Sequence, residues 1–116
     1  MSIHAQVRAA LAGLAGDRVY PLIAEEGTAT PYIVFQVVGG TPEGFLGGEK
    51  PEKRQHRVQV NVWSKSILEA GVIADQVEDA LRAVVELQTE VLTGAVDTYD
   101  EATKYRGQMQ DFSLFC

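Results

Sequence analysis

The alternation of side chains in RVQVNVWSKS, residues 57–66, constrains the fold more than any other stretch of the chain. Successive side chains of a β-strand point to opposite faces of its sheet, so Val58, Val60 and Val62 share one face and predict a buried side. The other face carries three polar residues and an aromatic one: Arg57, Gln59, Asn61 and Trp63. Because a tryptophan is usually well buried, this second face is expected to contact something.

A helix is predicted directly after this strand. Ser66 and Glu69 have the spacing of a capping box, in which two side chains bind free amide groups of the first helical turn. Apolar residues then recur at helical spacing along one stripe: Ala70, Ile73, Ala74, Val77, Leu81 and Val84. The pattern predicts an amphipathic helix of about 20 residues that packs on one face of the sheet.

The N-terminal third predicts another helix and two extended segments. Ser2 precedes an apolar stripe that indicates a helix over residues 3–15, with Gly16 as its stop. Pro21 places the next segment at a sheet edge or a strand end, because proline cannot donate a ladder hydrogen bond. The run YIVFQVV at 32–38 is apolar on both faces, which is typical of a central strand covered on both sides.

The C-terminal segment, residues 91–115, predicts two strands joined by a turn at 98–105. The alternation in the last strand changes phase, and a β-bulge near Gln110 or Asp111 explains the change. The expected fold is therefore α+β, with a mixed, largely antiparallel sheet and two helices packed on it. A chain of 116 residues fits a single domain over residues 1–116.

The sequence GGTPEGFLGGEKPEKRQ at 39–55 predicts a long mobile loop, since it is rich in glycine and lacks periodicity. Loops of this length in small domains are usually functional or disordered. Its apolar tip and its basic residues form a candidate assembly loop: Phe45, Leu46, Lys50, Lys53 and Arg54. A tip that folds back on its own domain is an equally weighted alternative. Interleaved glutamates favour a solvated basic segment over an anion site.

The residue types that catalysis and metal binding require are scarce. The chain has two histidines, His4 and His56, and one cysteine, Cys116, and their spacing matches neither a zinc site nor a catalytic pair. The GGEKP stretch lacks the Ser or Thr that follows the lysine of a P-loop. We therefore expect no catalytic residue, no metal and no cofactor.

Composition limits the partners. With 46% hydrophobic and 22% charged residues the chain is typical of a globular domain, and no stretch approaches the roughly 20 apolar residues of a membrane span. The first residues lack a secretory signal pattern, so we expect a cytoplasmic protein without membrane association. The formal charge of −6 repels phosphate backbones and argues against specific nucleic acid recognition.

Two interpretations of the polar face of residues 57–63 remain. In the first, the N-terminal helix over residues 3–15 covers Trp63 and leaves Arg57 in water. In the second, a neighbouring subunit covers the face, because Trp and Arg are enriched at the centres of protein interfaces. Under this interpretation the candidate subunit interface comprises Arg57, Gln59, Asn61 and Trp63.

Three segments in this order resemble the tail completion proteins of long-tailed bacteriophages, also called tail terminators. The segments are GDRVYPLIAEEGTATPYIVFQVVGG at 16–40, RVQVNVWSKSILEAGVIADQVEDAL at 57–81 and TYDEATKYRGQMQDFSLF at 98–115. None contains a catalytic motif, and together they span nearly the whole chain.

The resemblance implies a small α+β subunit, without an active site, from a phage or prophage. Such subunits assemble as a ring, typically of six copies, at the head-proximal end of the tail tube. The implied partners are further copies of the chain, the tail tube protein and the head connector protein, first in the host cytoplasm and then in the virion tail. The alternative is a small α+β module that binds a ligand or regulates without catalysis.

Overall fold

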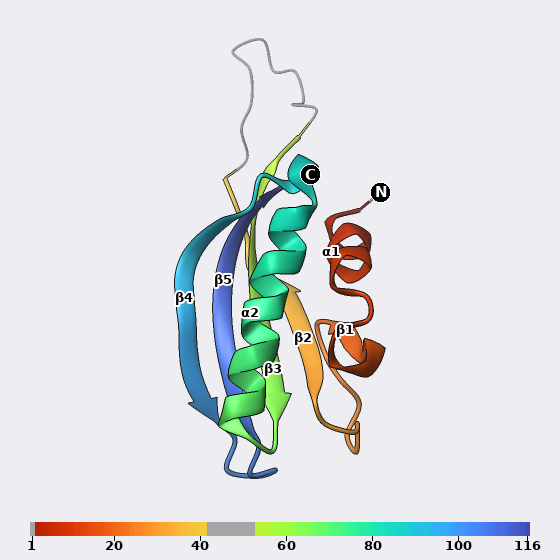
Figure 1. Ribbon diagram of the computed structural model, residues 1–116. Coiled ribbons are helices and arrows are strands. Elements are labelled where there is room, and N and C mark those ends of the chain that lie inside the picture. The colour runs from red at the N-terminus through yellow and green to blue at the C-terminus, as the bar shows by residue number, and fades with distance from the viewer. Residues whose placement is uncertain (1, 42–52) are drawn as a thin grey trace.

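The computed structural model describes residues 2–41 and 53–116 and shows two helices on a five-stranded sheet (Figure 1). In chain order the elements are α1 (Ile3–Leu11), the 3-10 helix η1 (Leu14–Asp17), β1 (Val19–Pro21), β2 (Tyr32–Val37), β3 (Gln55–Ser64), α2 (Ile67–Ala83), the 3-10 helix η2 (Val85–Leu87), β4 (Glu90–Tyr99) and β5 (Arg106–Phe115). The strand order is β1-β2-β3-β5-β4, and only the β1–β2 pair is parallel. The predicted α+β fold is confirmed.

The first helix begins where predicted and ends early. The Ser2 hydroxyl accepts a hydrogen bond of 3.1 Å from the Ala5 amide, which caps α1. The helix ends at Leu11 rather than near Gly16, because Gly13 takes a left-handed φ of 87° that an α-helix cannot continue through. The predicted stop is therefore three residues too late.

The second helix is capped through three side chains instead of two. Ser66 Oγ accepts from the Glu69 amide at 3.3 Å, as a capping box predicts. The Glu69 carboxylate accepts from the Ser64 hydroxyl at 2.6 Å, and that hydroxyl in turn accepts from the Ser66 amide at 3.0 Å. Ser64 thus relays the return bond and ties the end of β3 to the start of α2.

The sheet centre is β3, which corrects the prediction for residues 32–38. β3 pairs with β2 on one side and with β5 on the other, whereas β2 lies next to the short edge strand β1. β1 ends at Pro21, so the predicted place of this proline at a sheet edge is confirmed. Among the described elements, helices cover β2 on one face alone, so its apolarity on both faces has another cause.

The predicted bulge in β5 is wrong. All ten residues of β5 pair with β3 in one unbroken register from Gln55–Phe115 to Ser64–Arg106. The sequence of β5 suggests a change of phase because two polar residues, Gln108 and Gln110, occupy the side that faces the helices. Both are buried there. The register shifts occur in the partner strand β4, between Val91 and Thr93 and again before Val96.

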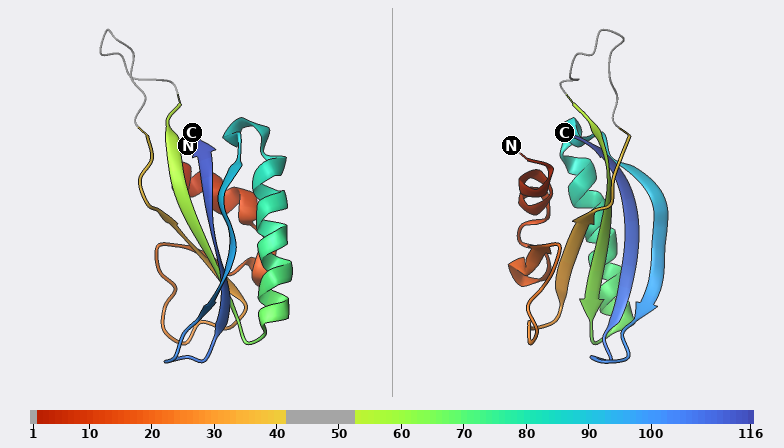
Figure 2. Two further views of the ribbon diagram at one scale, coloured as in Figure 1. Left: turned by 90° about the vertical axis from the view of Figure 1, so that its left-hand side faces the viewer. Right: turned by 180° about the vertical axis from the view of Figure 1, so that it is seen from behind.

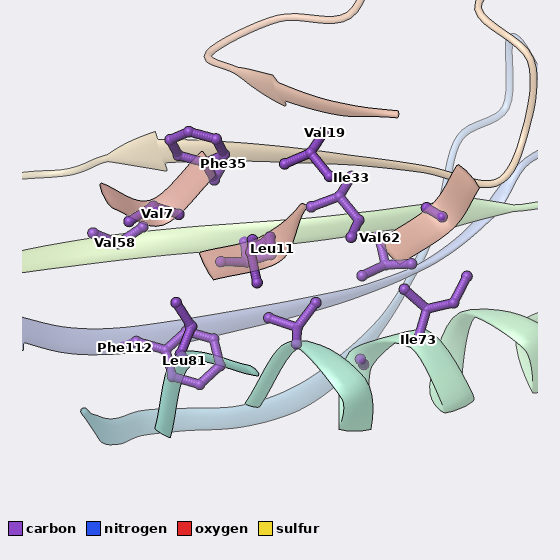
Figure 3. Packing of buried hydrophobic residues seen from close by; sticks show 14 of the residues in the cluster. Val7, Leu11, Val19, Ile33, Phe35, Val58, Val62, Ile73, Leu81 and Phe112 are labelled. Carbon is purple, nitrogen blue, oxygen red and sulfur yellow. The ribbon is translucent and has the colours of Figure 1, made fainter. Parts of the chain in front are cut away.

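Both helices pack on the valine face of the sheet (Figure 2). Val58, Val60 and Val62 have no exposed surface and meet Val7 and Leu11 of α1 in one core, which α2 and β5 complete (Figure 3). The interpretation in which the first helix covers Trp63 is therefore wrong, since α1 lies on the opposite face. No helix within residues 2–41 and 53–116 is long and apolar enough to cross a bilayer.

Candidate subunit interface

The sheet face that points away from α1 and α2 carries no helix from the described residues, 2–41 and 53–116 (Figure 2). We call it the open face. The strand registers place on it the following residues of β2, β3, β5 and β4: Tyr32, Val34, Gln36, Arg57, Gln59, Asn61, Trp63, Gly107, Met109, Asp111, Ser113, Thr93, Val96 and Thr98. All four predicted interface residues of β3 therefore lie side by side on one surface.

An ion pair occupies the end of the open face where β3 begins. Arg57 donates to Asp111 Oδ2 from its Nε at 3.2 Å and from one terminal nitrogen at 2.5 Å. The Asp111 side chain is 10% exposed and that of Arg57 is 47% exposed, so the pair presents the guanidinium to solvent. Asp111 Oδ1 is buried without a hydrogen bond. The predicted interface cation thus already has a partner within its own chain.

Trp63 lies at the opposite end of the face, where β3 ends. A β-carbon built on Gly107 would lie 2.8 Å from Trp63 Cε3, 2.5 Å from Thr98 Oγ1 and 2.8 Å from the Val62 carbonyl oxygen. The indole therefore lies over the glycine of the neighbouring strand, an arrangement that shields exposed backbone. The second face of β3 was expected to contact something, and for Trp63 part of that contact is Gly107 of the same chain.

Two tyrosines extend this aromatic end. The rings of Tyr32 and Tyr105 meet edge to face with centroids 6.2 Å apart. Burial, and next the proximity of Tyr105 and Asp100, raise the pKa of the Tyr32 phenol above its ordinary value. The hydroxyl is therefore protonated and neutral at physiological pH.

A hollow of about 310 Å³ opens beside these rings. Residues of β2, of β3 and of the segment after β1 line it: Leu22, Ile23, Ala24, Tyr32, Val34, Gln36, Asn61 and Trp63. The segment after β1 projects on the side of the sheet away from the helices (Figure 2). The hollow explains why β2 is apolar on both faces, because Val34 and Tyr32 line it.

Leu22 and Ile23 form the most exposed apolar wall of this hollow, with 68% and 74% of their surface accessible. The Ile23 amide donates to the Pro21 carbonyl at 2.8 Å across Leu22, whose φ is 71°. This is a γ-turn of the strained kind, and strained backbone of this type clusters at functional sites. Neither residue was among the predicted interface residues, although the sequence shows an apolar pair directly after a proline that ends a strand.

The predicted assembly loop is described only at its two ends. Lys53 Nζ donates to the Glu86 carbonyl at 2.7 Å, and Arg54 exchanges two backbone hydrogen bonds with Cys116 at 3.0 and 3.1 Å. The Arg57 amide donates to the Gly39 carbonyl at 2.8 Å, so the sheet ladder continues into both ends. Phe45, Leu46 and Lys50 lie outside the described residues.

Titratable side chains do not gather into a metal site anywhere in the described part of the chain. His4 is exposed on α1 and contacts the ring of Phe35 at a centroid distance of 6.4 Å, far from His56 at the start of β3. What the described surface offers is a contact area with an aromatic end and a charged end.

Comparison with protein families gives a match to a model described as tail completion protein gp17, which covers residues 1–115. The chain belongs to this family. It is a structural component of a phage tail, which confirms the resemblance found in the three sequence segments. A structural family of this kind also favours a role without catalysis.

The fold of this family member has a counterpart among solved structures. A chain in the structure titled "Virion of native gene transfer agent (GTA) particle" matches with a TM-score of 0.55 at 14% sequence identity. The match covers 94% of the present chain and 82% of the other chain. At this identity the likeness shows a shared fold. A search of curated proteins found no significant match.

Proposed function

We propose that the chain assembles as a ring of six copies, the number typical of the family, at the head-proximal end of the tail tube. There it stops tube growth and presents a surface for head joining. The observation that carries the proposal is the open face, which combines Trp63, the hollow and Arg57 in a chain of the tail completion family. The proposed partners are further copies of the chain, the tail tube protein and the head connector protein.

The chemistry of the open face supports a protein contact rather than a solvated surface. Tyr32, Val34 and Trp63 are only partly buried, and Leu22 and Ile23 are largely exposed. An apolar patch with a polar rim marks a protein interaction site. In a ring the contact is heterologous, so this face docks on a different surface of the next copy.

The segment 39–55 stays a proposed assembly arm. Its described ends leave the domain beside Arg54 and Gly39, at the opposite end of β3 from Trp63. We propose that this arm contacts the tail tube protein or the head connector protein. Assembly in the host cytoplasm before incorporation into the tail belongs to the same proposal.

The test is deletion of the gene from its parent phage or prophage, followed by electron microscopy of the particles. We expect tails of uncontrolled length without heads, and restoration by the wild-type gene. Particles with tails of normal length and attached heads would overturn the proposed function. Light scattering of the purified protein, alone and with tail tubes, gives the number of copies.

A matched pair of surface variants tests whether the open face mediates assembly. Asn61→Lys puts a charge beside the hollow, whereas Glu101→Lys puts one in the exposed turn between β4 and β5. Both should change monomer stability by about 0.5 kcal/mol or less. Only Asn61→Lys should abolish binding to tail ends, and equal binding by the two variants would contradict a role for this face.

A further inference from the structure

The helix layer carries a second unpartnered surface. Ala70, Ala74 and Val77 of α2 face the core, and the residues on the opposite side of the helix form one line that points away from the sheet. We call this line the outward stripe: Leu68, Val72, Asp75 and Asp79. All four are exposed, Leu68 by 81% and Val72 by 59% of their surface.

The outward stripe and the open face have their apolar parts at the same end of the domain. β3 ends at Ser64 and α2 begins at Ile67, so Trp63 and Leu68 lie close to one turn, on opposite sides of the sheet (Figure 1). A ring closes by rotation, which moves a patch around the axis without changing its height. Complementary patches must therefore share one height and face opposite ways, a condition that these two patches meet when the ring axis runs parallel to the strands.

The two surfaces also match in order and in length. From the apolar end, the open face runs from Trp63 and the hollow to the exposed guanidinium of Arg57, about 20 Å along a strand. The outward stripe runs from Leu68 and Val72 to the carboxylates of Asp75 and Asp79, about 16 Å along a helix. Apolar residues thus meet apolar residues, and acidic groups meet a cation.

We infer that the outward stripe of α2 in one copy packs on the open face of the next copy, with Leu68 and Val72 in the hollow and Asp79 beside Arg57. The inference rests on the proposed ring. It gives every sheet a helix layer on both faces, one from its own chain and one from its neighbour, and a sheet with helices on both faces is a stable layer arrangement.

A second copy suits the open face better than a small ligand or an unrelated protein. The hollow lies at the lower limit of ligand pocket volumes, about 300 Å³, and its most apolar wall is exposed. A contact between two open faces would leave the outward stripe without a partner. Only head-to-tail packing covers both surfaces with one contact.

Cross-linking of two single-cysteine variants tests the packing directly. Ile23→Cys and Leu68→Cys are each made with Cys116→Ser, and the two proteins are mixed, assembled and oxidised. The mixture should give covalent dimers, whereas each variant alone should give none, because the two cysteines meet only across a heterologous contact. Arg8→Cys, on the exposed side of α1, replaces Leu68→Cys as the control and should give no cross-link with Ile23→Cys.

A charge on the outward stripe gives an independent readout. Val72→Glu should weaken ring formation about 30-fold or more, because a carboxylate would be left unpaired at a desolvated contact. Ala5→Glu is the matched control, since Ala5 is also a small apolar residue exposed on a helix but lies on α1, outside the stripe. Thermal unfolding of both variants should match that of the wild type. Equal ring formation by the two variants would overturn the inference.

The outcomes separate this inference from the proposed function. Rings or tail ends that form without the Ile23–Leu68 cross-link overturn the helix-to-sheet packing and leave the ring proposal standing. Cross-links within the Ile23→Cys protein alone overturn it in favour of contact between open faces. A chain that stays monomeric at every concentration and is absent from purified tails overturns both.

Discussion

The two faces of the sheet are formed by the same strands but differ in how completely the chain covers them. The valine face is covered by α1 and α2 and carries residues such as Val60 with no exposed surface. The open face has no helix among the described elements and is only partly shielded, by Trp63 over Gly107 and by Arg57 over Asp111. Alternation along a strand therefore specifies two surfaces, and only one of them has to be covered by helices of the same chain.

The largest expected effect is a difference in the free energy of unfolding between substitutions on the two faces. Phe112→Ala removes a fully buried ring from the valine face and should lower the free energy of unfolding by about 3–5 kcal/mol. Met109→Ala, three residues away on the open face, removes a half-buried side chain and should cost about 1 kcal/mol. Urea denaturation measures both. Similar losses would mean that the open face is packed as tightly as the core.

Gly107 allows a test of the aromatic end alone. Gly107→Ala should destabilise the fold by about 1–3 kcal/mol, because the added carbon would meet the Trp63 ring and the Val62 carbonyl, and the backbone cannot move away freely. In Gly94→Ala the added carbon meets no atom within 4 Å, so its effect should stay within about 0.5 kcal/mol. If the two substitutions are equally tolerated, Trp63 is not seated on the glycine.

Arg57→Glu tests the charged end, where the ion pair changes what a charge reversal means. The new carboxylate would lie beside the buried carboxylate of Asp111 and should destabilise the monomer by about 1–2 kcal/mol, with solvent screening of the half-exposed position included. Adding Asp111→Asn should recover most of this loss. A variant with wild-type unfolding in urea would show that the Arg57–Asp111 pair does not stabilise the monomer.

Local patterns predicted the elements well because their causes are local. The valine alternation of β3, the caps at Ser2 and Ser66 and the edge position of Pro21 each depend on a few neighbouring residues. Glu69 was predicted to bond directly with its cap, whereas the bond passes through Ser64 in the preceding strand. That relay depends on where the strand ends, which periodicity does not specify.

The site was predicted less completely because its contacts join distant strands. The β3 residues of the open face follow from alternation, but the Arg57–Asp111 pair spans 54 positions and needs the β3–β5 register. Gln110 led to the wrong prediction of a bulge, because a polar residue in the alternation resembles a change of phase. Its amide instead donates to the Ala74 carbonyl at 3.3 Å inside the core. Leu22 and Ile23 lie in a short turn that carries no periodic signal.

The smallest expected effect concerns the protonation of Tyr32 at the aromatic end. Burial raises the pKa of this phenol above the ordinary value of 10.0, so the folded state holds its proton at a pH where the unfolded state releases it. The contribution to stability is complete below pH 10 and is lost as the pH rises through the folded pKa, since the unfolded state then binds fewer protons.

Tyr32→Phe should therefore weaken the decline of stability above pH 10, while Tyr99→Phe on the exposed edge strand controls for loss of a hydroxyl. If ring assembly covers the hollow, burial deepens and raises the folded pKa further, so the decline in wild-type protein should start near the same pH but extend to higher pH in rings than in monomers. An identical alkaline profile for wild type and Tyr32→Phe, measured by urea denaturation from pH 8 to about pH 11, would show that the phenol is as solvated as in the unfolded chain and that this end of the open face is not a desolvated surface.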